Sequence, residues 1–192
     1  MSVILCTFAV TQQPILVAEP EEASQTASQL MSAVRQGDYK TASGLMQGKP
    51  DLGVDREPAD IVGRLLWDEF LKSFTYEFEG SCYATKSGMA IDMSVHYLDF
   101  NSVMSTLGDR AGNLLKERAS EAEDPDELYD DENNYRQDLV DEVLELAARD
   151  AIREDSKTIT EKLTVSLSYE DGHWRVVPDS ALIHVISGGT AG

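Results

Sequence analysis

The feature that most constrains the fold is a strand signature near the end of the chain, within Thr160–Pro178. Apolar residues alternate there with polar ones at a period of two. This period is typical of a strand with one buried face. The apolar positions are Leu163, Val165, Leu167 and Tyr169. The pattern therefore predicts a half-buried β-strand over this segment.

A tight turn follows the strand at Asp171-Gly172. This dipeptide favours a type I′ turn, because both central residues of such a turn need a positive φ. A turn at this point pairs Tyr169 with Trp174 and sets all the apolar side chains on one face. Turn chemistry and alternation agree on a single register, so we predict a β-hairpin.

A second hairpin is predicted within Phe74–Phe100, where the period of two returns on both sides of Ser87-Gly88. A two-residue turn at Ser87-Gly88 pairs apolar residues across the two strands and places them on a common face. The expected pairs are Ala84 with Ile91, Cys82 with Met93, and Phe78 with Tyr97.

Helical periods fill most of the remaining chain. Helices are expected over 19–35, after Asp38, from Pro58 to about Lys72, after Asp99, and over 135–152. In the helices over 100–115 and 135–152, Met104, Leu107 and Leu146 are expected on the buried side. This order predicts an α+β domain, with helices on one face of an antiparallel sheet of about four strands in two hairpins.

The charge balance is strongly acidic, with 16 Lys and Arg against 35 Asp and Glu, a net charge of −19. Glu121–Asp155 alone holds 15 acidic and 3 basic residues, so −12 of that charge lies in one segment. Such a surface repels phosphate backbones, and nucleic acid is not an expected partner. Over Glu121–Asn134 we expect a solvated acidic loop.

The N-terminal segment allows two interpretations. Residues 1–18 contain the apolar run Ser2–Val10, and the sequence around Cys6 loosely resembles a lipobox. The segment is then the remnant of a signal sequence with Cys6 as the lipidated residue. The alternative is an N-terminal strand that packs on the domain. In either case residues 19–189 form a single domain, which is followed by a disordered Gly-rich tail.

Several short motifs together resemble a loose group of extracytoplasmic lipoproteins from Gram-positive bacteria with an NTF2-like, or cystatin-like, fold. The similar segments lie between about Glu21 and Gly189. They are Gln36-Gly37-Asp38-Tyr39 with Ala42, Tyr97-Leu98-Asp99 followed by Phe100-Asn101-Ser102-Val103-Met104, Asp171-Gly172-His173-Trp174-Arg175-Val176, and Ser187-Gly188-Gly189. The resemblance implies a curved sheet wrapped by helices, export, and attachment through a lipidated cysteine. It implies no catalytic residues, and the lipobox around Cys6 departs from the usual pattern.

Motifs for metal or cofactor chemistry are not recognised. His96, His173 and His184 lie far apart in sequence without metal-ligand spacing. An EF-hand loop started at Asp130 would place Tyr135 where a glycine is needed, so an EF-hand is rejected. No GxSxG, P-loop or GxGxxG motif occurs. We expect no cofactor and no metal site, and Cys82 is expected to be a small buried side chain.

The expected function is non-catalytic binding of a protein, peptide or small ligand outside the cytoplasm. A cavity between sheet and helices is the default site, with Trp67, Tyr97, Tyr169 and Trp174 as candidate lining residues; the alternative for each is core packing. The competing function is an NTF2-like enzyme of the isomerase or dehydratase type, with an acid/base pair in the cone. Asp92 and His96 share a strand face and are the candidates, although they lie opposite the apolar face. Cytoplasmic residence with a folded N-terminal strand stays open.

Overall fold

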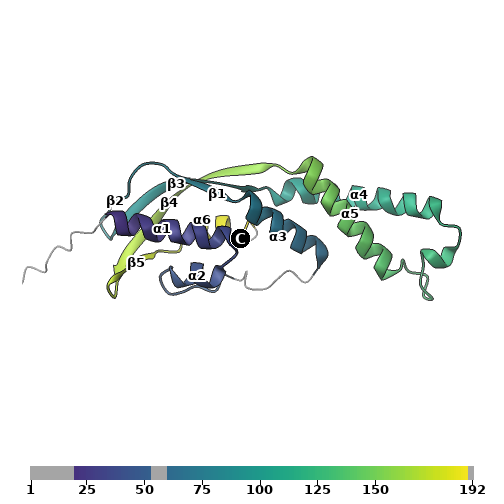
Figure 1. Ribbon diagram of the computed structural model, residues 1–192, viewed down its shortest axis with the longest axis horizontal. Coiled ribbons are helices and arrows are strands. Elements are labelled where there is room, and N and C mark those ends of the chain that lie inside the picture. Colours follow the sequence, from purple (N-terminus) through teal and green to yellow (C-terminus); the bar gives the residue numbers. More distant parts are fainter. Residues whose placement is uncertain (1–19, 53–59, 190–192) are drawn as a thin grey trace, which may run out of the picture.

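The computed structural model describes residues 20–52 and 60–189 (Figure 1). Its helices are α1 (Pro20–Arg35), α2 (Tyr39–Gly44), α3 (Ile61–Ser73), α4 (Phe100–Glu121), the short 3-10 turn η1 (Pro125–Glu127), α5 (Gln137–Asp155) and α6 (Ser180–Ile186). Its strands are β1 (Thr75–Phe78), β2 (Tyr83–Ala84), β3 (Met89–Leu98), β4 (Thr158–Glu170) and β5 (His173–Val176).

The strands form one antiparallel five-stranded sheet in the order β1-β3-β4-β5, with β2 also paired to β3. The longest pairing joins β3 to β4, from Met89 opposite Leu167 to Leu98 opposite Thr158. Helices α1, α2 and α6 lie on one side of this sheet (Figure 1). The predicted α+β class, an antiparallel sheet packed by helices, is confirmed.

The main core lies between the sheet and helices α1, α2, α3 and α6. Side chains of these elements interdigitate there away from water, and burial of this apolar surface is the main favourable contribution to folding. Large fully buried members are Leu30, Met31, Phe70, Tyr97, Leu167 and Ile186.

Aspartates begin four of the helices. The Asp38 carboxylate accepts a hydrogen bond from the Thr41 backbone N–H at 2.9 Å, as predicted for the start of α2. Asp99 likewise accepts from Asn101 N–H at the start of α4. Asp60 and Asp179 cap α3 and α6 in the same way. Each carboxylate satisfies a backbone donor that has no partner within the helix.

The hairpin β4–β5 has the register read from its sequence. Tyr169 pairs with Trp174 and Leu167 with Val176. Asp171 and Gly172 have φ of 50° and 82°, the left-handed conformations that a type I′ turn requires. Local turn chemistry and the apolar face therefore determined this hairpin together.

The register predicted for the earlier hairpin is wrong. Ala84 pairs with Met89, a shift of two residues, and Phe78 pairs with Met93, a shift of four. The connection after β2 is longer than two residues, since Thr85 N–H bonds the Gly88 carbonyl. Gly80, with φ of 99°, lies in a break between β1 and β2. Both shifts are even, so each residue keeps its face of the sheet although its partner changes.

Helices α4 and α5 form an antiparallel hairpin that projects beyond the sheet, and we call it the arm (Figure 1). Its own apolar cluster joins the two helices, with α3 packed alongside. The buried members are Leu107, Ala111, Val143, Ala147 and Ala148. The prediction for Met104 and Leu146 is wrong, because both are exposed, Met104 by 50%. Only a narrow strip of each helix is buried between α4 and α5, and Met104 and Leu146 lie outside this strip.

The last described segment, Ser180–Gly189, consists of helix α6 and a turn. The apolar cluster expected around Leu182 forms helix α6, which packs into the main core. The Ile186 carbonyl accepts a hydrogen bond from the buried Tyr39 hydroxyl at 3.0 Å. Ser187–Gly189 continue from α6 as a turn, and the rest of the predicted Gly-rich tail lies outside the described residues. None of the helices in the described ranges is both long enough and apolar enough to cross a membrane.

Candidate functional site

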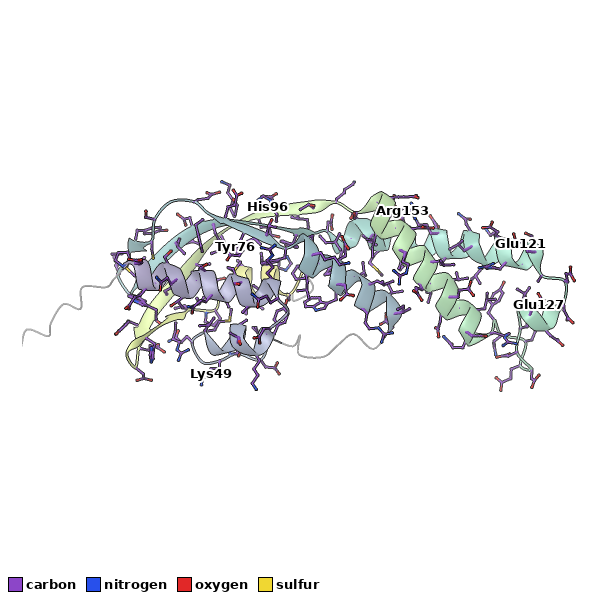
Figure 2. All side chains as sticks on the ribbon, viewed as in Figure 1. Lys49, Tyr76, His96, Glu121, Glu127 and Arg153 are labelled. Carbon is purple, nitrogen blue, oxygen red and sulfur yellow. The ribbon has the colours of Figure 1, made fainter. Side chains whose placement is uncertain are left out.

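The tip of the arm, residues 122–136, is a structured connection between α4 and α5. Leu128 is buried there, and its carbonyl accepts the Arg136 backbone N–H at 2.9 Å. Glu121 and Glu127 lie at the far end of the molecule from the sheet (Figure 2). A buried apolar side chain and backbone hydrogen bonds within the segment thus give this strongly polar tip a defined conformation.

A tight turn organised by Asp130 forms the second half of the tip. One oxygen of its carboxylate accepts the backbone N–H groups of Glu132 and Asn134, both at 2.9 Å. The rings of Tyr129 and Tyr135 stack with centroids 5.1 Å apart, and their backbones form a bridge. Tyr135 remains 41% exposed. The turn therefore presents an aromatic pair among carboxylates.

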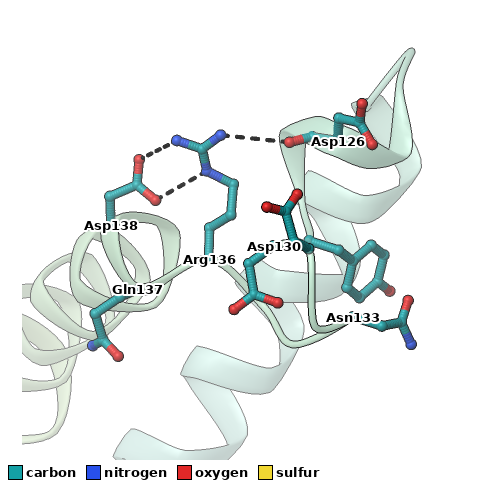
Figure 3. Close-up of a pocket in the computed structure, with 8 residues that line it drawn as sticks. Asp126, Asp130, Asn133, Arg136, Gln137 and Asp138 are labelled. Carbon is teal, nitrogen blue, oxygen red and sulfur yellow. Dashed lines mark hydrogen bonds and ion pairs between the residues drawn. The ribbon is translucent and has the colours of Figure 1, made fainter.

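An open hollow of about 690 Å³ lies at this turn (Figure 3). Arg136 crosses its edge and donates two hydrogen bonds to the Asp138 carboxylate, each of 3.1 Å. The Arg136 guanidinium holds the pKa of the Asp138 carboxyl below its usual value. The lining residues are Asp126, Tyr129, Asp130, Asp131, Asn133, Arg136, Gln137 and Asp138.

The electrostatic character of the tip is negative. Nine acidic residues and one basic residue, Arg136, occupy positions 121–138. Asp138 pairs with Arg136, and Glu121 lies 3.9 Å from Arg118 of α4. The other carboxylates of this segment have no ion pair among the described residues. Within the described residues, no three His, Cys, Asp or Glu side chains are grouped so as to hold a metal ion. The arrangement suits a cationic protein surface better than an anionic one.

The four aromatic residues proposed from the sequence fall into two separate pairs. Trp67 and Tyr97 both contact Phe70, with ring centroids 5.0 and 5.9 Å away. Tyr169 and Trp174 form an edge-to-face contact at 5.3 Å on the β4–β5 hairpin. Tyr97 and Trp174 are members of the main core, whereas Tyr169 is largely exposed. Their role as ligand contacts stays a prediction.

Asp92 and His96 lie on the outer face of β3, away from the helices; Figure 2 shows His96 there. Asp92 accepts hydrogen bonds from Thr164 Oγ1 at 2.6 Å and from the Tyr83 hydroxyl at 3.2 Å. His96 Nδ1 bonds Thr160 Oγ1 at 2.8 Å. Each of the two candidate residues is thus bonded to β4 rather than to the other.

A group of polar side chains on the helix-facing side was missed. The Tyr97 hydroxyl donates to Glu161 Oε1 at 2.5 Å, and His184 Nε2 of α6 lies 3.9 Å from the same oxygen. Burial and this carboxylate raise the pKa of the Tyr97 hydroxyl above its usual range, so it stays a donor. Glu161 occupies the register of Leu163 and Val165. A carboxylate in an otherwise apolar alternation was the signal that could have revealed it.

Of the two cysteines, Cys82 lies in the described part of the chain and Cys6 does not. Cys82 is buried next to β2, as predicted, and burial raises the pKa of its thiol. Cys6, the residue proposed for lipidation, lies outside the described residues. So does the rest of residues 1–18, including the strand considered as the alternative.

Comparisons with known proteins add little. No protein-family model and no curated protein sequence matches the chain. The chain is similar to a crystal structure of a protein described as a putative lipoprotein from Bacillus subtilis, with 16% sequence identity and a TM-score of 0.37. The match covers 83% of this chain but 44% of the other, so this chain spans less than half of that protein's length.

Proposed function

We propose that this protein is a non-catalytic, extracytoplasmic binding domain with an NTF2-like fold, attached to a membrane through Cys6. Its partner is a protein or peptide with basic side chains, and the tip of the arm makes the contact. The antiparallel sheet covered on one side by helices supports the fold assignment. The lipobox-like sequence before Cys6 supports the attachment.

The observation that carries the proposal is the arm itself. Helices α4 and α5 pack on each other through a cluster separate from the main core, and they extend beyond the sheet (Figure 1). Within the described residues, the arm contributes little to the main core. Its tip is nevertheless ordered by Leu128, Asp130 and Arg136. A projecting arm with a structured tip is suited to contact another molecule.

The chemistry of the tip indicates the kind of partner. Lysine and arginine side chains are attracted by the carboxylates of Asp126 and Asp131, and their cations also interact with the faces of exposed tyrosine rings. Tyr135 supplies an exposed ring, and the partly exposed Tyr129 stacked on it lines the hollow. A partner of this type is steered towards the acidic arm before contact, and its association rate falls as salt concentration rises.

Site-specific photocrosslinking tests the contact. A photoreactive residue at Asn134 is expected to form a covalent adduct with a basic partner, and one at Ser87 on the β2–β3 turn is not. Neutralising Glu123, Asp126, Asp131 and Glu132 as amides should reduce the adduct at Asn134. Equal adducts at both positions, or an adduct unaffected by neutralisation, would exclude the tip as the contact.

Acyl labelling tests the attachment. When the full chain is produced in a Gram-positive host with a labelled fatty acid, the label should enter the protein and the protein should fractionate with the membrane. Cys6→Ser should abolish both, while Cys82→Ser retains them because Cys82 is a buried structural residue. Label that persists in Cys6→Ser would rule out lipidation at Cys6.

An enzyme of the isomerase or dehydratase type is the second candidate, favoured by the group around Glu161. A carboxylate held by a tyrosine donor and close to an imidazole is suited to proton transfer. The test is exchange of acidic C–H protons into D₂O across a panel of cyclic ketones. Glu161→Gln should abolish any exchange that the native protein shows, whereas Asp92→Asn should not. If the native protein shows no exchange, the enzyme candidate is rejected and the binding function is the remaining proposal.

A further inference from the structure

We infer that, on an anionic lipid surface, the molecule stands with its arm directed away from the membrane. This inference rests on the proposed attachment through the N-terminal segment. It concerns the orientation of the folded domain rather than the attachment itself. The observations behind it are where the chain enters the domain and where its negative charge is concentrated.

The entry point of the chain and the tip of the arm lie at opposite ends of the long axis (Figure 1). Helix α1 begins at Pro20 near the end that also carries β2 and the β4–β5 turn. The arm projects from the other end of the sheet, and Glu121 and Glu127 mark its tip (Figure 2). An anchor before α1 therefore holds the domain by the end farthest from the tip.

The charge is distributed unevenly along the same axis. The segment Glu121–Asp155 carries −12 of the total −19. Helix α4 has 22 residues, which corresponds to a length of about 33 Å. The Debye length is about 8 Å at 0.15 M salt, so carboxylates at the raised tip lie beyond the range of the surface potential. If the arm lay flat, these carboxylates would come within that range and be repelled by anionic headgroups.

Attachment at one end of the domain and electrostatic repulsion between the arm and the lipid headgroups together determine the proposed orientation. Attachment before α1 keeps that end of the domain near the membrane, and repulsion between the acidic arm and the headgroups disfavours orientations in which the arm lies flat. The consequence is that Tyr135 and the hollow at the tip face outward, where a soluble or surface-bound basic partner can reach them. Anionic headgroups repel the acidic arm, so the arm does not bind to the lipid surface.

Energy transfer to labelled vesicles tests the orientation without using native lipidation. An N-terminal hexahistidine form of Cys6→Ser is bound to vesicles that contain phosphatidylglycerol, a nickel-chelating lipid and an acceptor lipid. A donor dye is placed either at Ser87→Cys, near the attached end, or at Asn134→Cys, at the tip. Both positions are exposed, and Cys82 is buried.

Transfer from position 87 should exceed transfer from position 134 by about twofold or more at 0.15 M salt. Adding Glu123→Gln, Asp126→Asn, Asp131→Asn and Glu132→Gln should raise transfer from position 134 on anionic vesicles. Equal transfer from the two positions would overturn the inference. If the four substitutions leave transfer from position 134 unchanged, charge repulsion does not determine the orientation. Because the tag replaces the lipid, these results are independent of whether Cys6 is acylated.

Discussion

Gly188 shows how closely the end of the described chain is packed. Its φ is +68°, and a Cβ atom would lie 2.4 Å from Cε2 of Phe100 and 3.3 Å from Cδ2 of Phe70. Both a left-handed backbone and a ring contact therefore require glycine. The Ser187-Gly188-Gly189 sequence is thus explained by packing of α6 against the aromatic side of the core.

We expect Gly188→Ala to lower the free energy of unfolding by about 2–4 kcal/mol, because strain and overpacking add. Gly48→Ala is the matched control, since Gly48 has φ of +71° but open space around its Cα. That variant should lose only about 1 kcal/mol from the backbone. Urea unfolding of the two variants measures the difference. Equal losses would mean that the contact with Phe100 relaxes without cost.

Asp155, the last residue of α5, joins the two helices of the arm to each other. Its carboxylate accepts hydrogen bonds from Thr106 Oγ1 at 2.7 Å and from Arg110 Nε at 2.9 Å. These donors hold the pKa of Asp155 below its usual value. A carboxyl with a lowered folded-state pKa stabilises the fold above its unfolded pKa, near 3.8, and this contribution disappears as the pH falls through the folded-state pKa.

Asp155→Asn should therefore reduce stability at neutral pH and have progressively less effect as the pH falls below about 4. Thermal unfolding followed between pH 2.5 and 7 measures this convergence. Asp150→Asn, on the same helix and paired with Arg153 on the surface, should shift the curve little. A difference between native protein and Asp155→Asn that stays constant over the whole range would show that the carboxylate charge is not involved.

The arm should respond to mutation independently of the sheet. Leu107→Ala removes a buried side chain from the cluster between α4 and α5, and we expect a loss of about 2–4 kcal/mol in that region. Hydrogen exchange should accelerate in α4 and α5 while β3 and β4 stay protected. Met104→Ala on the same helix should have almost no effect, since Met104 is half exposed. Uniform acceleration by Leu107→Ala would mean that arm and sheet unfold together.

How far the sequence predicted these elements depends on the range of the interactions that determine them. The β4–β5 hairpin was predicted with its register, because Asp171-Gly172 and the adjacent alternation act locally. The register at β1 and β2 depends on Gly80 and on a longer connection at Thr85, and neither leaves a periodic signal. Met104 and Leu146 match a helical stripe, but the crossing of α4 and α5 decides which residues the seam buries.

The candidate sites show the same limit. The acidic composition of the tip was evident from the sequence, whereas the stacked Tyr129 and Tyr135 require the turn at Asp130. Glu161 and His184 come together only when α6 packs beside β4, which joins segments that no local pattern connects. Asp92 and His96 were placed on the correct face, and β4 supplies the bonding partners that their spacing did not reveal.

The charge of the whole molecule should make its stability depend on salt. With a net charge of −19, self-repulsion disfavours the compact state, and added ions screen it. The melting temperature should therefore rise as NaCl increases from low to moderate concentration. The variant with Glu123, Asp126, Asp131 and Glu132 changed to amides should show a shallower rise. Identical salt dependence in the two proteins would locate the repulsion outside the arm.

The order in which the sheet is assembled has a consequence for biosynthesis. Strands β3 and β4 pair with each other although the whole arm separates them in sequence, with Met89 opposite Leu167. Such distant pairing is slow to form, and on the ribosome it waits until most of the chain has emerged. The arm, a helical hairpin, closes through contacts close in sequence, while α6 adds the last core residues at the end. A nascent chain whose central sheet forms late stays unfolded for longer, although its helical arm can already be closed.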